Sequence, residues 1–199
     1  MKRTVTVIGS ASVSVEPDCA RLQCGVQVAG SNAQDALRRS NSAVQSILTT
    51  LRGHGVSATD LRTNGPNLYP TDAGYSGSND VTVMIRNIDA VGDVIDAVAA
   101  AGGPNLTMHG VSFSVSDRGQ HLPAARAAAM EAARAIAAQL AAAAGAALGE
   151  VVTISEGSGG TAPVPVGRGQ MLKSTPVEPG AQEIVVEVTV TFRLIDMKG

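Results

Sequence analysis

Aromatic and clustered basic residues are scarce in this sequence. There is no tryptophan among the 199 residues, and two tyrosines and two phenylalanines are all the aromatic side chains. The 15 lysines and arginines form no basic block and are outnumbered by 17 acidic residues, which gives a net charge of −2. Nucleic-acid binding depends on basic clusters and, for single strands, on stacking aromatic side chains. The composition therefore argues against a nucleic-acid partner.

Long hydrophobic runs are also missing, although 44% of the residues are hydrophobic. No run approaches the roughly 20 apolar residues that span a bilayer. Near the N-terminus, Thr4, Thr6 and Ser10 interrupt any continuous apolar segment of the kind found in a secretory signal. We expect no membrane span and, for the sequence as given, a cytoplasmic location. The alternative is an exported protein of the cell envelope whose signal has been removed.

The two cysteines, Cys19 and Cys24, lie on one predicted strand. Their odd spacing places them on opposite faces, and five residues of strand span about 17 Å. A disulfide requires Cα atoms within about 7 Å of each other. We therefore expect no disulfide between them and no metal site, with Cys24 buried in the core and Cys19 at the surface.

Two stretches near the N-terminus alternate between apolar and polar residues, as half-buried strands do. They cover residues 4–15 and 20–28, and Glu16-Pro17-Asp18 between them has the composition of a turn. This arrangement predicts a long N-terminal β-hairpin. The clearest alternation is at residues 183–195. Its inward residues are Ile184, Val186, Val188, Val190, Phe192 and Leu194.

Helical spacing separates the strands. Ser31 and Gln34 fit a capping box before an apolar periodic stretch that stops near Gly53. A short helix is expected at residues 91–98, and an alanine-rich helix at residues 122–144. Residues 70–79 and 157–180 are rich in glycine, serine or proline and are expected to be loops. The fold class predicted is α+β, a largely antiparallel sheet with helices on one face, forming a single domain over residues 1–199.

Several short motifs follow one another along the chain. They are Val7-Ile8-Gly9, Pro17-Asp18, Gly55-Val56, Asp60-Leu61-Arg62-Thr63, Tyr69-Pro70, residues 91–97, Gly110-Val111-Ser112-Phe113 and, after the alanine-rich helix, Gly145 and Leu148-Gly149. In this order they resemble the SIMPL (DUF541) family over nearly the whole chain. The resemblance implies a sheet-and-helix fold and a tendency to oligomerise. Many bacterial relatives are exported envelope proteins. It implies no catalytic residues.

Two glycine-rich motifs come near known site patterns but lack required parts. Gly74-Tyr75-Ser76-Gly77-Ser78 is similar to a nucleophile elbow, yet its fifth residue is serine and a strand pattern follows it where the motif requires a helix. Phosphate-binding loops are followed by a lysine or lead into a helix. Gly157-Ser158-Gly159-Gly160-Thr161 has neither feature. We interpret both as loops.

Histidines and aspartates form no recognisable catalytic or metal-binding pattern. His54, His109 and His121 never lie at spacings that suit one metal ion, and His109 shares the parity of the inward residue Val111. We expect His109 to be a hydrogen-bonded histidine, either in the core or at a strand end. A second set of residues, Asp89, Asp93 and Asp96, lies on the short helix, where acidic residues near the N-terminus favour the helix dipole. No catalytic residue, cofactor or metal ligand is predicted.

We therefore expect a non-catalytic binding or assembly protein of the SIMPL type, with an unknown protein partner or a second copy of itself. We predict a homo-oligomer joined through sheet edges or the outer faces of its strands, because residues 4–15 contain no charge and no proline to protect a strand edge. In the alternative, residues 183–195 of the same chain cover that edge. Two other functions remain open. One is an enzyme with a site between residues 70–79 and the strand of His109, and the other is a small-molecule carrier with an enclosed apolar pocket.

Overall fold

A computed structural model of the protein describes residues 3–157, 161–164, 175 and 177–196. The chain divides into two compact units. The first consists of Met1–Glu16, Asp117–Val166 and Gly180–Gly199, and the second of Pro17–Ser116 and Gly167–Pro179. The single domain over residues 1–199 stays a prediction. Within the described residues, no helix has the length and apolar character needed to cross a membrane.

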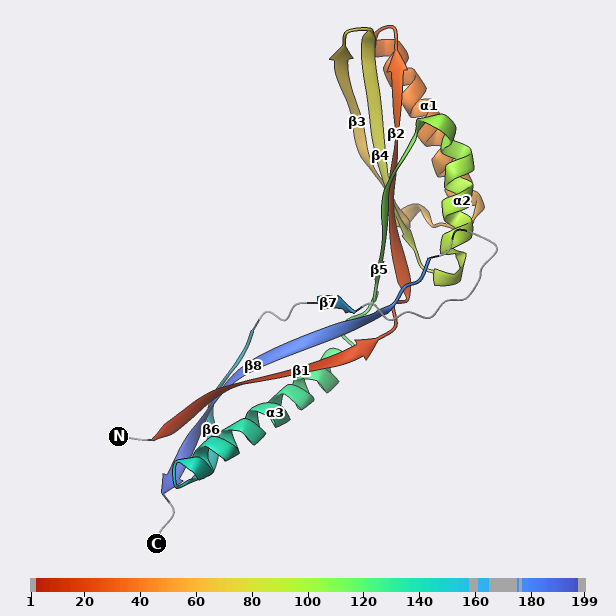
Figure 1. Cartoon of the computed structure of the whole chain (residues 1–199). Coiled ribbons are helices and arrows are strands. Elements are labelled where there is room, and N and C mark those ends of the chain that lie inside the picture. The colour runs from red at the N-terminus through yellow and green to blue at the C-terminus, as the bar shows by residue number, and fades with distance from the viewer. Residues whose placement is uncertain (1–2, 158–160, 165–174, 176, 197–199) are drawn as a thin grey trace. The chain divides into compact units, whose positions relative to one another are not determined.

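The first unit is an antiparallel sheet with one helix on it (Figure 1). Its elements are β1 (Thr4–Val15), α3 (Leu122–Ala143), β6 (Ala146–Glu156), β7 (Thr161–Val164) and β8 (Ala181–Asp196). The strand order is β1-β8-β6, and β7 also pairs with β8. Five of the six inward positions predicted for β8 are buried, namely Ile184, Val186, Val188, Val190 and Phe192, whereas Leu194 is only partly buried.

Small side chains let α3 approach this sheet closely. The helix buries Ala125, Ala129, Ala133, Ala137 and Ala141, which repeat every four residues along one face. Opposite them stands Gly9 of β1, where an added Cβ would lie only 2.2 Å from the carbonyl oxygen of Ala129. The core of this unit is therefore formed by short side chains and by close contact between the helix and strand backbones.

The second unit is a four-stranded antiparallel sheet covered on one face by two helices (Figure 1). Its strands are β2 (Cys19–Gly30), β3 (Leu61–Thr71), β4 (Gly74–Ile85) and β5 (Leu106–Ser114), in the order β3-β4-β2-β5. Its helices are α1 (Ala33–Gly53) and α2 (Val91–Gly102), with 3-10 turns at Ala58–Asp60, Ile88–Ala90 and Gly103–Asn105. Aliphatic residues from both helices and from β2 and β4 form its core.

The fold class is confirmed: the protein is α+β, its sheets are antiparallel, and each sheet carries its helices on one face. The predicted N-terminal hairpin is wrong. β1 pairs with β8, in a register from Thr4↔Arg193 to Val15↔Gln182, whereas β2 pairs with β4 and β5 in the other sheet. Alternation reports which face of a strand is buried and does not specify the neighbouring strand.

The residues between β1 and β2 make a junction where a hairpin turn was expected. The carboxylate of Asp18 accepts hydrogen bonds from the backbone N–H of Ser116, at 2.7 Å, and from its hydroxyl, at 2.6 Å. The backbone N–H of Asp18 also donates to the carbonyl of Ser114, at 3.2 Å. These bonds tie the start of β2 to the end of β5 and hold the two ends of the 17–116 segment together.

The loop predicted at residues 70–79 is also wrong, because β3 and β4 extend through it and leave only Asp72 and Ala73 as the turn. Glycine is required at Gly77, where an added Cβ would lie 2.8 Å from the carbonyl oxygen of Ala36 in α1. Part of the loop predicted at residues 157–180 forms β7, and the rest lies largely outside the described residues. The cap of α1 is Asn32, whose side chain accepts from the N–H of Asp35, and not Ser31 as predicted.

Candidate functional sites

One edge of β1 is covered by β8, as the alternative to self-association through this strand predicted, and the other edge of β1 is the first candidate surface. In an antiparallel pair, alternate residues direct their backbone groups toward the partner strand. The N–H of Leu194 donates to the carbonyl of Arg3 at 2.9 Å, so the odd-numbered residues of β1 bond to β8. The backbone groups that point away from β8 belong to Thr4, Thr6, Ile8, Ser10, Ser12 and Ser14. No strand among the described residues pairs with that side of β1.

Protection of the sheet edges differs between strands. β3 carries Pro66 and Pro70, which cannot donate to a ladder. β5 and β6 are interrupted by register shifts, and β6 also carries Glu150 and Glu156. β1 has none of these features, and its side chain Ile8 is 55% exposed. Of the edge strands described, β1 is the one best suited to accept another strand.

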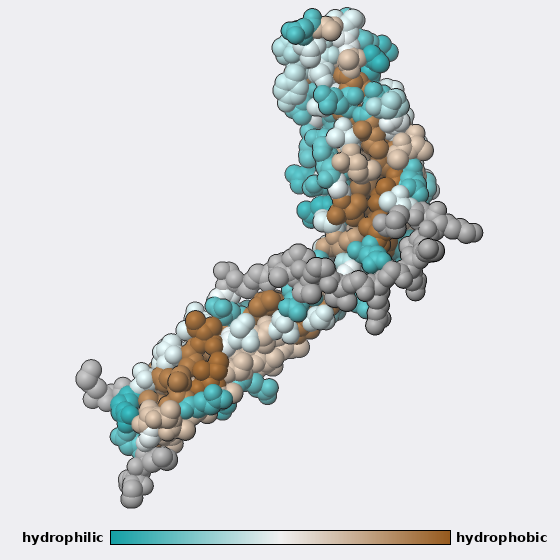
Figure 2. All heavy atoms as spheres, in the orientation of Figure 1, coloured by the Kyte–Doolittle hydropathy of each residue, from teal (hydrophilic) through white to brown (hydrophobic). Residues whose placement is uncertain are grey.

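Large exposed apolar side chains gather in the same unit. Figure 2 shows hydrophobic surface on both units, including the part formed by β1, β6, β8 and α3. The exposed apolar residues of this unit are Ile8, Ile136, Leu140, Val152, Ile154 and Ile195. Charged pairs lie among them, with Arg3 bound to Asp196 and Arg193 bound to Glu150. The surface of this unit therefore combines a free strand edge with apolar contact area.

The second candidate surface is the face of the β3-β4-β2-β5 sheet that α1 and α2 do not cover. Its side chains are mostly amides and hydroxyls, and Gln27 donates to the hydroxyl of Ser76 at 3.3 Å. In the middle of this face, Nε2 of His109 on β5 lies 3.2 Å from Oδ1 of Asp80 on β4. The two side chains are 45% and 44% exposed. They face each other across β2.

Two irregularities bring Asp80 and His109 together. Gly25 of β2 stands between them, and an added Cβ there would lie 2.2 Å from Oδ1 of Asp80, so the carboxylate rests directly over the glycine. On β5, Gln23 pairs with Gly110 and Cys24 pairs with Met108, which leaves His109 as the extra residue of a bulge. Gly110 has a φ of 140°, a conformation that favours glycine.

The side chain of His109 is therefore 45% exposed, so the core position predicted from parity is wrong, whereas the predicted hydrogen bond is present and joins it to Asp80. A bulge turns a side chain to the other face of the sheet, and here it directs His109 to the open face. Gly110 was the available signal, because a glycine inside a strand often marks a bulge. The enzyme alternative placed a site near this strand, and Asp80 follows directly after residues 70–79.

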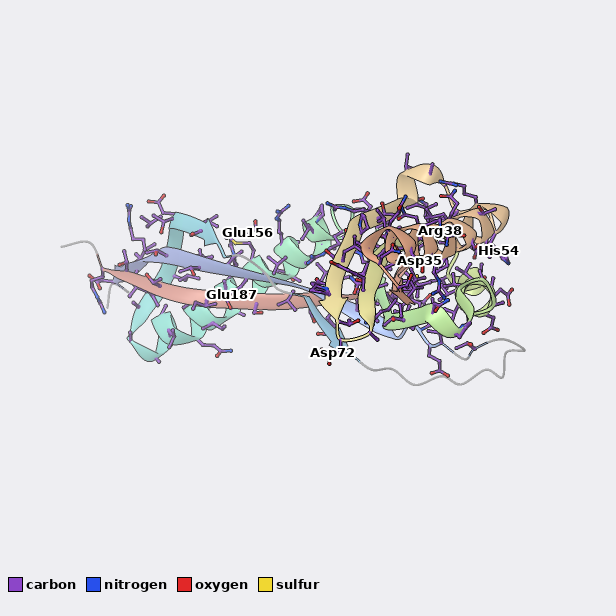
Figure 3. All side chains as sticks on the ribbon, turned by 90° about the horizontal axis from the view of Figure 1, so that it is seen from above. Asp35, Arg38, His54, Asp72, Glu156 and Glu187 are labelled. Atoms are coloured by element: carbon purple, nitrogen blue, oxygen red, sulfur yellow. The ribbon has the colours of Figure 1, made fainter. Side chains whose placement is uncertain are left out.

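The other histidines lie apart from this pair. His54 ends α1, the helix that also carries the Asp35–Arg38 ion pair (Figure 3), and its Nδ1 lies 3.0 Å from the carbonyl oxygen of Thr50. His121 precedes α3. In the described parts of the chain, no group of three or more histidine, cysteine, aspartate or glutamate side chains is placed to hold a metal ion.

The two glycine-rich motifs and the three aspartates considered in the sequence lie in strands, at a strand end and in helical turns. Residues 74–78 form the first half of β4, paired with β2 and β3, where a nucleophile elbow would need a turn into a helix. Gly157 follows β6 and Thr161 begins β7, with the residues between them outside the described ranges. The three aspartates predicted on the short helix have different surroundings. Asp89 lies in the first turn of the 3-10 helix Ile88–Ala90, and Asp93 lies in the first turn of α2. Asp96 accepts hydrogen bonds from the backbone N–H and the hydroxyl of Thr175.

Both cysteines are free and buried, so the surface position predicted for Cys19 is wrong. The Cys19 thiol lies 3.2 Å from the carbonyl oxygen of Ser114 at the β2–β5 junction. Burial raises the pKa of both thiols, and raises the pKa of Cys24 to about 11. A thiol that stays protonated is a poor nucleophile and metal ligand. The positions of the two cysteines favour a structural role.

One hollow of about 500 Å³ lies along the exposed side of α1. Its lining is polar: Ser42, Gln45, Ser46, Thr49 and Thr50. The hydroxyls of Ser46 and Thr49 bond back to carbonyls of the same helix, at 3.3 and 2.8 Å. It is therefore not the enclosed apolar pocket that the carrier alternative requires.

Comparison with known proteins places the chain in a family. Residues 5–192 match the family model described as "SIMPL: Protein of unknown function (DUF541)". The chain belongs to the SIMPL family. A SIMPL relative, the 26 kDa periplasmic immunogenic protein of Brucella melitensis, is 32% identical and aligns with 96% of this chain and 84% of its own length. Another, YggE of Escherichia coli K12, is 26% identical over 94% of this chain and 78% of its own.

A solved structure of a protein from Galdieria sulphuraria covers 89% of this SIMPL chain and 84% of its own, with 11% identity and a TM-score of 0.29. That similarity is too low to carry an argument. The resemblance noted from the sequence motifs is confirmed by the family match.

Proposed function

We propose that this SIMPL protein is a non-catalytic binding and assembly protein that associates with copies of itself through the free edge of β1. The observation that carries the proposal is the unprotected edge. Twelve residues of β1 offer alternate backbone N–H and C=O groups with no charge or proline between them. A strand that adds to this edge satisfies those groups and extends the sheet.

Energetic considerations support an interface that also uses side chains. Each backbone hydrogen bond contributes only about 0.5–1.5 kcal/mol net, and association costs at least about 4 kcal/mol in lost freedom of motion. Edge pairing alone is therefore marginal. Ile8 is 55% exposed, so burying the rest of its side chain would add roughly half of the about 1.5–3 kcal/mol that a fully exposed side chain contributes. Exposed apolar residues in the same unit enlarge the area that a second copy can cover.

The test is the mass in solution. Light scattering of the wild-type protein at low micromolar concentration should give a mass above the 20.1 kDa of one chain. Ile8→Lys should shift the protein to the monomer without changing its circular dichroism, because a lysine on an edge strand opposes pairing with another strand. The matched control is Thr153→Lys on β6, an exposed position of the same sheet at its opposite edge.

Two results would count against this proposal. One is a mass near one chain that does not change on tenfold concentration. The other is equal dissociation by Ile8→Lys and Thr153→Lys, which would show a general effect of charge and no contact at β1.

We also propose an envelope location. The Brucella relative is named as periplasmic, which supports the exported alternative over the cytoplasmic one. Fractionation of the native host, with detection of the full-length gene product, tests this: recovery with cytoplasmic markers would contradict it.

A further inference from the structure

The contact between Asp80 and His109 is not explained by its contribution to stability. Ion pairs between exposed groups are worth about 0–1 kcal/mol, and both side chains are close to half exposed. Three local features are needed to form this contact: a glycine in the central strand, a bulge on β5 and a glycine with positive φ. Bulges that re-aim a side chain are over-represented next to functional sites.

We propose that Asp80 and His109 form a binding site for a divalent transition-metal ion, of the kind that an imidazole nitrogen and a carboxylate oxygen hold together. Zn²⁺ and Cu²⁺ are the ions that suit these two ligand types. The site lies wholly within the sheet of the second unit, and it does not depend on the proposed self-association through β1.

The distance between the two ligand atoms fits such an ion. Zinc binds histidine nitrogen and carboxylate oxygen at about 2.0–2.2 Å, in tetrahedral geometry, which places two ligand atoms roughly 3.3 Å apart. Nε2 of His109 and Oδ1 of Asp80 are 3.2 Å apart. An ion can therefore replace the shared proton without a shift of either strand. The donor set contains no thiolate, because both cysteines are buried.

The surroundings suit an ion that keeps water in its other positions. The pair lies on the face of the sheet opposite α1 and α2, where both side chains are open to solvent. Gln23 and Gln27 are two residues to either side of Gly25, on the same face of β2, and Thr107 pairs with Gly25 from β5. The amide of Gln27 already donates to the hydroxyl of Ser76, so Gln23 and Thr107 are the polar neighbours on this face that we expect to hydrogen-bond to metal-bound water.

Gly25 prepares the carboxylate for binding. Since the carboxylate of Asp80 rests over Gly25, any side chain there would displace it from His109. The two ligands therefore need little rearrangement when the ion binds, and this compensates in part for their small number. With two protein ligands, exchange of the ion should be fast.

The experiment is a titration of the full chain, free of any histidine tag, with ZnCl₂. The ring signals of His54, His109 and His121 are followed by NMR, and heat is measured by calorimetry. We expect one ion per chain and a shift of the His109 ring signals before any other. Cu²⁺ and electron paramagnetic resonance should report a bound nitrogen ligand in the same protein.

Four variants locate the site. His109→Gln and Asp80→Asn should each weaken binding about tenfold or more, and Gly25→Ala should do the same with both ligands still present. His54→Gln is the matched control, because it removes an exposed histidine that lies elsewhere, and it should bind as the wild type does. Circular dichroism and melting curves identify any variant that fails to fold, and the binding comparison then rests on the folded ones.

The proposal is overturned by either of two results. One is the absence of a His109 response up to millimolar Zn²⁺. The other is a response in which His54→Gln weakens binding as much as His109→Gln, which would show adventitious binding to scattered surface histidines. These two results do not depend on self-association. They have the same meaning whether or not the protein forms oligomers through β1.

Discussion

Replacing Gly9 with alanine should destabilise the unit formed by β1, β6, β8 and α3. Gly9 does not have a positive φ, so alanine can adopt its backbone conformation. The difficulty is space. The new Cβ would lie 2.2 Å from the carbonyl oxygen of Ala129 and 2.6 Å from the backbone nitrogen of Ala133. Both are backbone atoms of α3, so no side-chain rotation relieves the contact.

The magnitude follows from how far the helix must move. An ordinary contact of this kind begins near 3.4 Å, so α3 must withdraw by roughly 1 Å, a gap that forfeits a quarter to a half of the dispersion energy of the contacts it opens. Overpacking in cores typically costs about 1–3 kcal/mol. We expect about 2–3 kcal/mol here. For a unit of this size each kcal/mol lowers Tm by about 4–8 °C.

Thermal unfolding followed by circular dichroism measures the loss, and amide hydrogen exchange assigns it to α3 and β1. The control is Gly53→Ala at the end of α1, where nothing lies within 4 Å of the added Cβ; it should be neutral or stabilising by up to about 1 kcal/mol. Adding Ala133→Gly to Gly9→Ala should not restore stability, because the backbone contacts remain. Wild-type stability in Gly9→Ala would refute the close packing of helix on strand.

Three further experiments test other parts of the fold. Val188→Asp should unfold the protein, because Val188 is 3% exposed and an unpaired buried carboxylate costs several kcal/mol. Thr189→Asp, on the other face of β8, should cost far less. Equal melting temperatures for the two variants would contradict the assignment of faces. The Arg86 guanidinium donates two hydrogen bonds to the carboxylate of Asp60 and lowers the pKa of Asp60. Ionised Asp60 therefore stabilises the fold above its unfolded pKa of about 3.9, and this contribution is lost as pH falls through its lower folded pKa. Acid titration of Asp60→Asn should therefore show a shallower loss of stability below about pH 4 than the wild type, and identical curves would disprove the role of the pair. The Cys24 thiol, with a pKa of about 11 and no exposed surface, should react with Ellman's reagent at pH 8 only after unfolding, and rapid labelling of the folded protein would show that it is accessible.

The faces of the strands were predictable from the sequence, but their neighbours were not. Alternation in β1 and β8 identified the buried side correctly, since Val7, Val188 and Phe192 lie in the core. It could not show that β1 pairs with a strand almost the whole chain length away. Turn-like residues before Asp18 suggested a hairpin, yet they serve a junction that is stabilised by hydrogen bonds to Ser116.

Local composition misled wherever a tertiary contact required an unusual residue. Residues 70–79 look like a loop because they are glycine- and serine-rich, but α1 packs so closely on β4 that Gly77 has to be small. His109 looked buried by parity, and the bulge at Gly110 reversed its direction. The Asp80–His109 pair could not be predicted from spacing, because the two residues meet only through pairing of both strands with β2.

The pairing of β1 with β8 has a consequence for synthesis of the chain. Translation proceeds from the N-terminus, so β1 leaves the ribosome before its partner β8. The segment 17–116 is synthesised between them, and its two ends are joined by the hydrogen bond between Asp18 and Ser116. This segment can therefore fold before β8, the partner strand of β1, has been synthesised. Throughout that interval both edges of β1 lack a partner. An unpaired strand without charge or proline can pair with the same strand of another chain, so premature pairing of β1 is the misassembly that this topology favours.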